Sequence, residues 1–296
     1  MAAPDQFQDR GRSVIPLREM AAWRDHAPWP TDLQVEQDLL LSKAMAAIFS
    51  DDFLRSQVAM RGGTVLHKVH LAPAARYSED IDLVQIGDRP IRHVEKGLVR
   101  VIQPVLGTPR SSMIADVRLA IRNWIMPSKI LRLEYGYRPA VAQDVEAKLK
   151  IEVNYTERTS FYDIVDLPYS CPIPGFRDVT LRSYDIDEML GTKMRALLQR
   201  EQGRDLFDPW WAWTKSQKGE VAPVVDPDRV VAAFNHYMGR EGTVVRRAEF
   251  EDELAKKMTL TKFRTDMDGM LRPSFGAYDI AAAEAAVREV FLARLS

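Results

Sequence analysis

Asp80 and Asp82 lie two residues apart in an aliphatic segment, Ser-Glu-Asp-Ile-Asp-Leu-Val, of the kind that forms a buried strand. Successive strand side chains point to opposite faces, so both carboxylates point the same way. Paired carboxylates supply the hard oxygen ligands that Mg2+ prefers. The spacing therefore predicts a metal site on this strand, with Asp80 and Asp82 as ligands.

A glycine pair stands upstream of these acids. Gly62 and Gly63 open a predicted helix whose first hydroxyl belongs to Thr64, and Ser78 can turn the chain into the acidic strand. Backbone N–H groups at a helix start favour an anion such as phosphate, and glycine lets it come close. A metal site beside a phosphate site indicates phosphoryl or nucleotidyl transfer.

A second strand carries a third candidate acid. In the segment Lys-Leu-Lys-Ile-Glu-Val-Asn-Tyr, residues 148–155, apolar side chains alternate with polar ones. Glu152 lies on the polar side, where it could join Asp80 and Asp82 around a metal ion. A solvent-facing acid on a half-exposed strand is nearly as consistent with the pattern.

Composition sets wider bounds. The chain has 296 residues, 46% of them hydrophobic and 28% charged, and a net charge of -1, so it is not basic throughout. The single cysteine, Cys171, and the lack of a signal-like or membrane-length apolar run predict a cytoplasmic protein with no membrane association. His67 and His70 are three residues apart, but a packing or surface role is favoured over metal binding.

Helical periodicity positions the remaining elements. A helix is expected over residues 31–49, where Glu36 and Asp38 would complement the helix dipole. Another is expected after Asp185, with Lys193 at the edge of its apolar stripe, and a further segment follows Gly203. The tryptophans of that segment are interpreted as core residues. Between residues 111 and 137 the pattern is clear only at 129–135, which indicates a strand.

Four of these segments, in this order, resemble one known family. They are the run RGGTVLHKVHLAPAARYSEDIDL, the strand KIEVNY, the helix DEMLGTKMRALLQR and the segment GRDLFDPWW. Together they are similar to the motifs of the AbiEii/AbiGii and MenT nucleotidyltransferase toxins, and the resemblance covers roughly residues 33–215. It extends to the VEQDLLL helix, which resembles the entry helix of the family.

The resemblance implies an α+β fold of the DNA polymerase beta-like nucleotidyltransferase superfamily: a mixed sheet flanked by helices, with a mainly helical C-terminal lobe. We expect a loosely structured lead at 1–32, a nucleotidyltransferase-like core at 33–175 and a helical lobe at 176–296. The implied reaction is Mg2+-dependent, with Mn2+ as an alternative, and moves a nucleoside monophosphate from an NTP to an acceptor. For the MenT branch the acceptor is the 3' end of tRNA, which blocks aminoacylation. The implied partner is an AbiEi-like antitoxin, as in abortive-infection toxin–antitoxin systems.

The resemblance also assigns residues. Asp80 and Asp82 would be catalytic metal ligands, and Gly62, Gly63, Thr64 and Ser78 would contact the nucleotide. The helical lobe would contribute two further catalytic residues to the cleft, Lys193 for the triphosphate and Asp208. Asp208 could orient Lys193 or activate the acceptor hydroxyl, and Asp205 competes for that role.

Two other functions remain open at this stage. The same fold could attach a nucleotide to a protein hydroxyl, as in AMPylation. Alternatively, the chain could be a non-catalytic module that binds a nucleotide and a partner. No short motif specifies the base or the acceptor.

Overall fold

The computed structural model describes residues 15–121 and 124–296, and the first fourteen residues of the predicted lead lie outside this range. Its N-terminal part alternates helices and strands. The helices are α1 (Leu17–Trp23), α2 (Asp32–Ser50), α3 (Asp52–Gln57), α4 (Gly62–Val65), a π-helical turn (Leu66–His70) and α5 (Ile91–Leu106). The strands are β1 (Val58–Arg61), β2 (Asp80–Gln85), β3 (Ser111–Ile121), β4 (Trp124–Tyr137), β5 (Ala147–Asn154), β6 (Val165–Tyr169) and β7 (Val179–Ser183).

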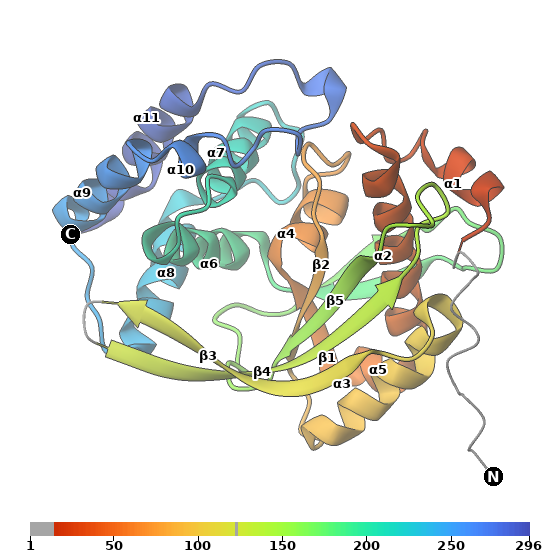
Figure 1. The fold of residues 1–296 in the computed structure, drawn as a ribbon. Coiled ribbons are helices and arrows are strands. Elements are labelled where there is room, and N and C mark those ends of the chain that lie inside the picture. Colours follow the sequence, from red (N-terminus) through yellow and green to blue (C-terminus); the bar gives the residue numbers. More distant parts are fainter. Residues whose placement is uncertain (1–14, 122–123) are drawn as a thin grey trace, which may run out of the picture.

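The C-terminal part is helical. It contains α6 (Ile186–Gln199), α7 (Arg204–Gln217), α8 (Pro227–Arg240), α9 (Arg247–Met258), α10 (Thr261–Arg264), α11 (Ile280–Val290) and two 3-10 turns (Pro273–Phe275 and Leu292–Arg294). Figure 1 shows these helices gathered on one side of the molecule, with α1, α2 and α5 on the other. The predicted α+β class, with a mixed sheet and a mainly helical C-terminal lobe, is confirmed.

The seven strands of the described residues form one mixed sheet in the order β3-β4-β5-β2-β1-β7-β6. β2 pairs antiparallel with β1 and parallel with β5, so the two acid-bearing strands are direct neighbours near the middle of the sheet. The weak pattern at 111–137 hides a long hairpin, β3–β4, of which only the strand at 129–135 is predicted from sequence. In Figure 1 this hairpin sweeps beneath α6 and α8.

The proline-rich segment after residue 165 is partly a strand. Pro168 belongs to β6 and pairs with Thr180 of β7. β6 is an edge strand of the sheet, and a proline is tolerated there because its missing N–H can face outward.

Helix α2 is buried on nearly every side. Thr31 caps it with a capping box, and α1 and α5 pack against it. The acids of its first turns have more specific roles than the expected dipole interaction. Glu36 accepts from the backbone N–H of Ala140 at 2.8 Å, and Asp38 accepts from Trp23 Nε1 at 2.8 Å. The described part of the lead, residues 15–32, is therefore packed onto the core through Trp23 and Trp29, which are 5% and 3% exposed.

Candidate active site

Three acids share one face of the sheet at the junction of β2 and β5. Asp80 is paired in register with Lys150, and Asp82 with Glu152. Directly paired residues in neighbouring strands project to the same side, so Asp80, Asp82 and Glu152 form one acidic cluster. Arg132 on β4 lies opposite Glu152, and its Nε donates to Glu152 Oε1 at 2.6 Å. Glu152 is therefore neutralised within the sheet.

The glycine pair is required by packing at this point. Gly62 has φ +83°, and a Cβ placed there would lie 2.1 Å from Asp82 Oδ2. A Cβ on Gly63 would lie 2.6 Å from Arg76 Nη2. The two glycines thus make room for one carboxylate of the cluster and for a guanidinium behind it.

Thr64 and Ser78 fix the backbone that leads into β2. The Thr64 hydroxyl donates to the Asp80 carbonyl oxygen at 2.5 Å and lies 2.9 Å from Ser78 Oγ. Thr64 has no exposed surface. Its position indicates a supporting role beneath the acidic strand.

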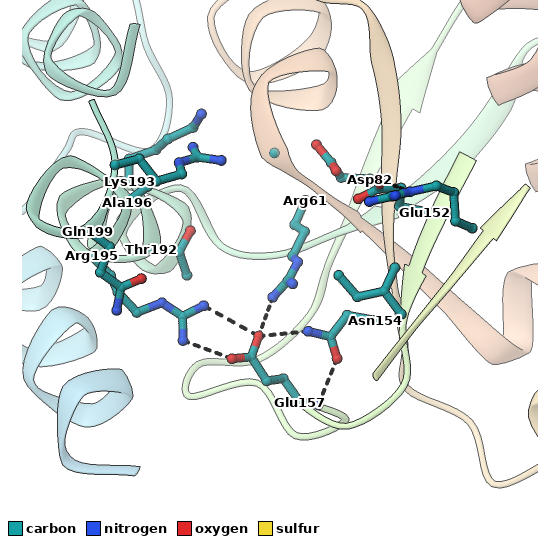
Figure 2. Close-up of a pocket in the computed structure, with 14 residues that line it drawn as sticks. Arg61, Asp82, Glu152, Asn154, Glu157, Thr192, Lys193, Arg195, Ala196 and Gln199 are labelled. Carbon is teal, nitrogen blue, oxygen red and sulfur yellow. Dashed lines mark hydrogen bonds and ion pairs between the residues drawn. The ribbon is translucent and has the colours of Figure 1, made fainter. Parts of the chain in front are cut away.

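A cavity of about 260 Å3 lies between this face and helix α6. It brings together four of the residues singled out in the sequence: Gly62, Asp82, Glu152 and Lys193. Figure 2 shows Lys193 on the α6 wall and Asp82 and Glu152 on the strand wall. Asp80 lies two residues along the same face of β2, and Gly63, Thr64, Ser78 and Asp208 lie outside the lining.

The lining carries more positive than negative charge. Five of its side chains are cationic and three are carboxylates. The cationic ones are Arg61, Arg132, Lys193, Arg195 and Arg200, and the acids are Asp82, Glu152 and Glu157. A triphosphate is the kind of polyanion that such a lining attracts.

Lys193 is anchored from below by Asp208. Its Nζ lies 2.8 Å from Asp208 Oδ2 and 3.4 Å from Asp205 Oδ1. The sequence places Lys193 at the edge of an apolar stripe, but the side chain is only 11% exposed because these carboxylates draw it inward. Asp208 also accepts two hydrogen bonds from Arg76, each 2.7 Å long, and lies 2.9 Å from His67 Nε2.

This geometry bears on the role of Asp208. The side chain has no exposed surface. Burial raises its pKa, but the charges of Arg76 and Lys193 outweigh burial and hold the pKa of Asp208 well below its usual range. A buried carboxylate that stays ionised at neutral pH is suited to orienting Lys193. Asp205 is equally buried and pairs with Arg200 at 2.8 Å.

The acids on the strand face behave in the opposite way. Burial raises the pKa of Asp80 to about 6; Lys150 opposes the shift, while Asp82 and Glu152 add to it. Burial and the Glu152 charge also raise the pKa of Asp82, against the opposing charges of Arg61 and Lys193. Within the described residues no hydrogen bond or ion pair reaches the Asp82 carboxylate, and Asp80 has only Lys150 at 4.0 Å.

Several residues of the site had no signal in the sequence. Arg76 and His67 meet Asp208 across 132 and 141 residues. Arg61 and Arg195 both form ion pairs with Glu157, which lies in the loop after β5. Only Arg61 could have been suspected, because it directly precedes the glycine pair.

The donor set fits a divalent cation that takes few ligands from the protein. Across residues 15–121 and 124–296, no three histidine, cysteine or acidic side chains are grouped so as to hold a metal ion. Mg2+ commonly takes only one or two carboxylates and completes its shell with phosphate oxygens and water. Asp80 and Asp82, unpaired or weakly paired on one face, meet that requirement without Glu152.

A mixed sheet with an Asp-x-Asp strand beside a glycine-initiated helix, facing a lysine on a second lobe, defines a nucleotidyltransferase. The family model described as nucleotidyl transferase AbiEii toxin, type IV toxin–antitoxin system, matches residues 43–288, and the chain belongs to this family. The resemblance stated from the motifs is thereby confirmed. No curated protein sequence matches the chain.

Solved structures agree in fold. MenT4, a nucleotidyltransferase toxin from Mycobacterium tuberculosis, superposes with a TM-score of 0.52 at 18% identity, over 94% of this chain and 88% of MenT4. JHP933 from Helicobacter pylori superposes with a TM-score of 0.50 at 14% identity, over 88% of this chain and 90% of JHP933. The family implies an NTP substrate and an antitoxin partner. In the described residues no helix is long and apolar enough to cross a bilayer.

Proposed function

We propose that this toxin transfers a nucleoside monophosphate from an NTP to the 3' end of tRNA in a Mg2+-dependent reaction. The observation that supports it best is Asp82, which has no strong partner and faces the anchored Lys193 across a cation-rich cavity, with the weakly paired Asp80 two residues along the same strand face. Carboxylates with raised pKa values in a cleft are characteristic of functional sites.

In this reaction a hydroxyl attacks the α-phosphate and pyrophosphate leaves. A bound Mg2+ would neutralise charge on the triphosphate and on the attacking oxygen, and Asp80 and Asp82 would hold it. Lys193 would contact a triphosphate oxygen, and Asp208 would orient Lys193 rather than receive a proton, since it is sealed from the cavity. The backbone at Gly62 lines the same cavity and would approach the phosphates closely.

The acceptor proposal rests on positive charge beside the acids of the strand face. Arg132 and Lys150 lie on the sheet face next to the acids, and their side chains are 35% and 40% exposed. Partly exposed cations beside a phosphoryl-transfer site suit the backbone of an RNA end. A protein hydroxyl as acceptor, or nucleotide binding without turnover, would be different outcomes of the same assay.

The test uses each of the four NTPs, labelled on the α-phosphate, with purified total tRNA, with cell lysate proteins, and with and without Mg2+. We expect label in tRNA from one preferred NTP only when Mg2+ is present. Label in protein instead of tRNA would show that the acceptor is a protein hydroxyl, as in AMPylation, and would overturn the tRNA proposal. NTP binding without pyrophosphate release on any acceptor would refute the catalytic proposal.

The antitoxin is proposed to be AbiEi-like. Expression of the toxin alone should arrest growth, and co-expression of a neighbouring AbiEi-like gene should restore it. Growth arrest that persists in the Asp80→Ala variant would show that toxicity does not depend on transfer.

A further inference from the structure

Asp82 has a cationic neighbour that does not bind it. Arg61 is the residue directly opposite Asp82 in the antiparallel β1–β2 pair, so the two side chains leave the sheet on the same face. The Arg61 guanidinium nevertheless turns away and donates from Nη1 to Glu157 Oε2 at 2.7 Å. Figure 2 shows Arg61 directed toward Glu157, with Asp82 on the other side.

In the β4–β5 strand pair, by contrast, an arginine does bind the acid opposite it. Arg132 lies directly opposite Glu152 in the β4–β5 pair, and there the arginine does bind the acid, at 2.6 Å. Opposite charges at directly opposed positions usually attract in this way. The two pairs differ because Arg61 has another acceptor, Glu157, within reach.

Glu157 is fixed independently of Arg61. Its carboxylate accepts from Arg195 Nη1 of helix α6 at 2.8 Å and from Asn154 Nδ2 at 3.1 Å. Its side chain is 14% exposed, and Tyr184 Oη donates to its backbone oxygen at 3.4 Å. The Glu157 carboxylate is therefore a fixed acceptor whose hydrogen bonds link strand β5 to helix α6.

We infer that Glu157 is a positioning residue: by holding Arg61, it keeps that guanidinium off Asp82 and leaves the Asp82 carboxylate free for a divalent cation. This inference rests on the proposed function, because it assigns the cation to Asp82. Loss of Glu157 frees Arg61 to pair with the acid opposite it, as Arg132 does with Glu152. The released guanidinium then competes with the cation.

The test is a double-mutant cycle on Mn2+ affinity. Electron paramagnetic resonance measures the binding of Mn2+ alone, without NTP, to the full-length chain. We expect Glu157→Gln to weaken Mn2+ binding about tenfold, the scale seen when a partner outside the ligand set is lost. Arg61→Gln alone should change the affinity by less than about threefold, because Arg61 is already directed away, and in the Glu157→Gln background it should restore binding.

The cycle separates positioning from charge and from folding. If only through-space charge acted, Arg61→Gln would raise the affinity equally in both backgrounds, which overturns the inference. A structural role for Glu157 would leave the double variant as weak as the single one, which also overturns it. Melting temperatures of all four proteins accompany the titrations.

Glu241→Gln is the matched control. Glu241 accepts from Arg195 at 3.2 Å but does not contact Arg61, so its loss should leave Mn2+ affinity unchanged. Wild-type protein that binds no Mn2+ would overturn the proposed metal site and this inference with it. Wild-type binding with an equal affinity in Glu157→Gln would overturn the role of Glu157 alone.

Discussion

Replacing Asp208 by asparagine tests the buried charge network beneath Lys193. The carboxylate has no exposed surface, and Arg76, which donates to it twice, is only 2% exposed. An asparagine is nearly isosteric, but its amide nitrogen is a donor. In either orientation that N–H meets an N–H of Arg76, so one buried donor loses its acceptor and two cations lose a charge partner.

The size of the loss follows from this geometry. Breaking a buried ion pair by removing one partner costs about 3–5 kcal/mol. At about 2.1 cal/mol/K of unfolding entropy per residue, a chain of 296 residues then loses about 5–8 °C in melting temperature. The pKa of Asp208 is held well below its usual range, so its contribution to stability is complete above the unfolded-state pKa. The difference between wild type and variant should persist at neutral pH and shrink below about pH 4.

Thermal unfolding at several pH values measures this directly, with Asp205→Asn as the matched control. Asp205 is equally buried and also lies 3.4 Å from Lys193, but its closest partner, Arg200, has a side chain 45% exposed and can turn to water. Its loss should therefore cost only about 1–2 kcal/mol. A melting temperature for Asp208→Asn within about 2 °C of wild type would refute the account of this network.

Three further outcomes are expected. Asp80→Ala should abolish nucleotide transfer and leave the melting temperature at pH 7 unchanged or higher. The fold disfavours the ionised Asp80 side chain, since its pKa is raised to about 6, and a clear destabilisation would contradict this. Gly62→Ala should impair both transfer and stability, since its Cβ would meet Asp82 at 2.1 Å and φ is +83°; normal transfer would show that the turn can shift. Lys193→Ala should raise KM for the NTP and cost about 1–3 kcal/mol in unfolding free energy by leaving buried carboxylates less satisfied; unchanged kinetics would reassign Lys193 to structure.

Local sequence patterns were enough to predict two features of the site: the shared direction of the strand acids and the glycine turn beside them. The common direction of Asp80 and Asp82 follows from a two-residue spacing, and the need for glycine at 62 follows from the positive φ. The long hairpin β3–β4 was mostly missed; its outer strand β3 lies at the edge of the sheet and pairs only with β4.

The partners of these residues could not be predicted from sequence. Register decides that Glu152 lies beside Asp82 and that Arg132 lies beside Glu152, and no local pattern encodes register between β2, β5 and β4. Arg76 reaches Asp208 from a loop 132 residues earlier, which only the docking of the helical lobe can bring about. Lys193 was therefore located correctly on its helix while its burial went unforeseen.

The acids in and around the cavity fall into two groups, those with strong cationic partners and those without. The first group supports the structure, and the second lies at the proposed metal site. Cationic partners hold the pKa of Asp208 and that of Glu157 well below the usual range, whereas burial raises those of Asp80 and Asp82. Acids without strong partners on a half-buried face destabilise the fold at neutral pH, and a bound cation would offset that cost. Mn2+ should therefore raise the melting temperature more at pH 7 than at pH 5, where Asp80 is mostly protonated. An equal rise at both pH values would place the cation away from Asp80.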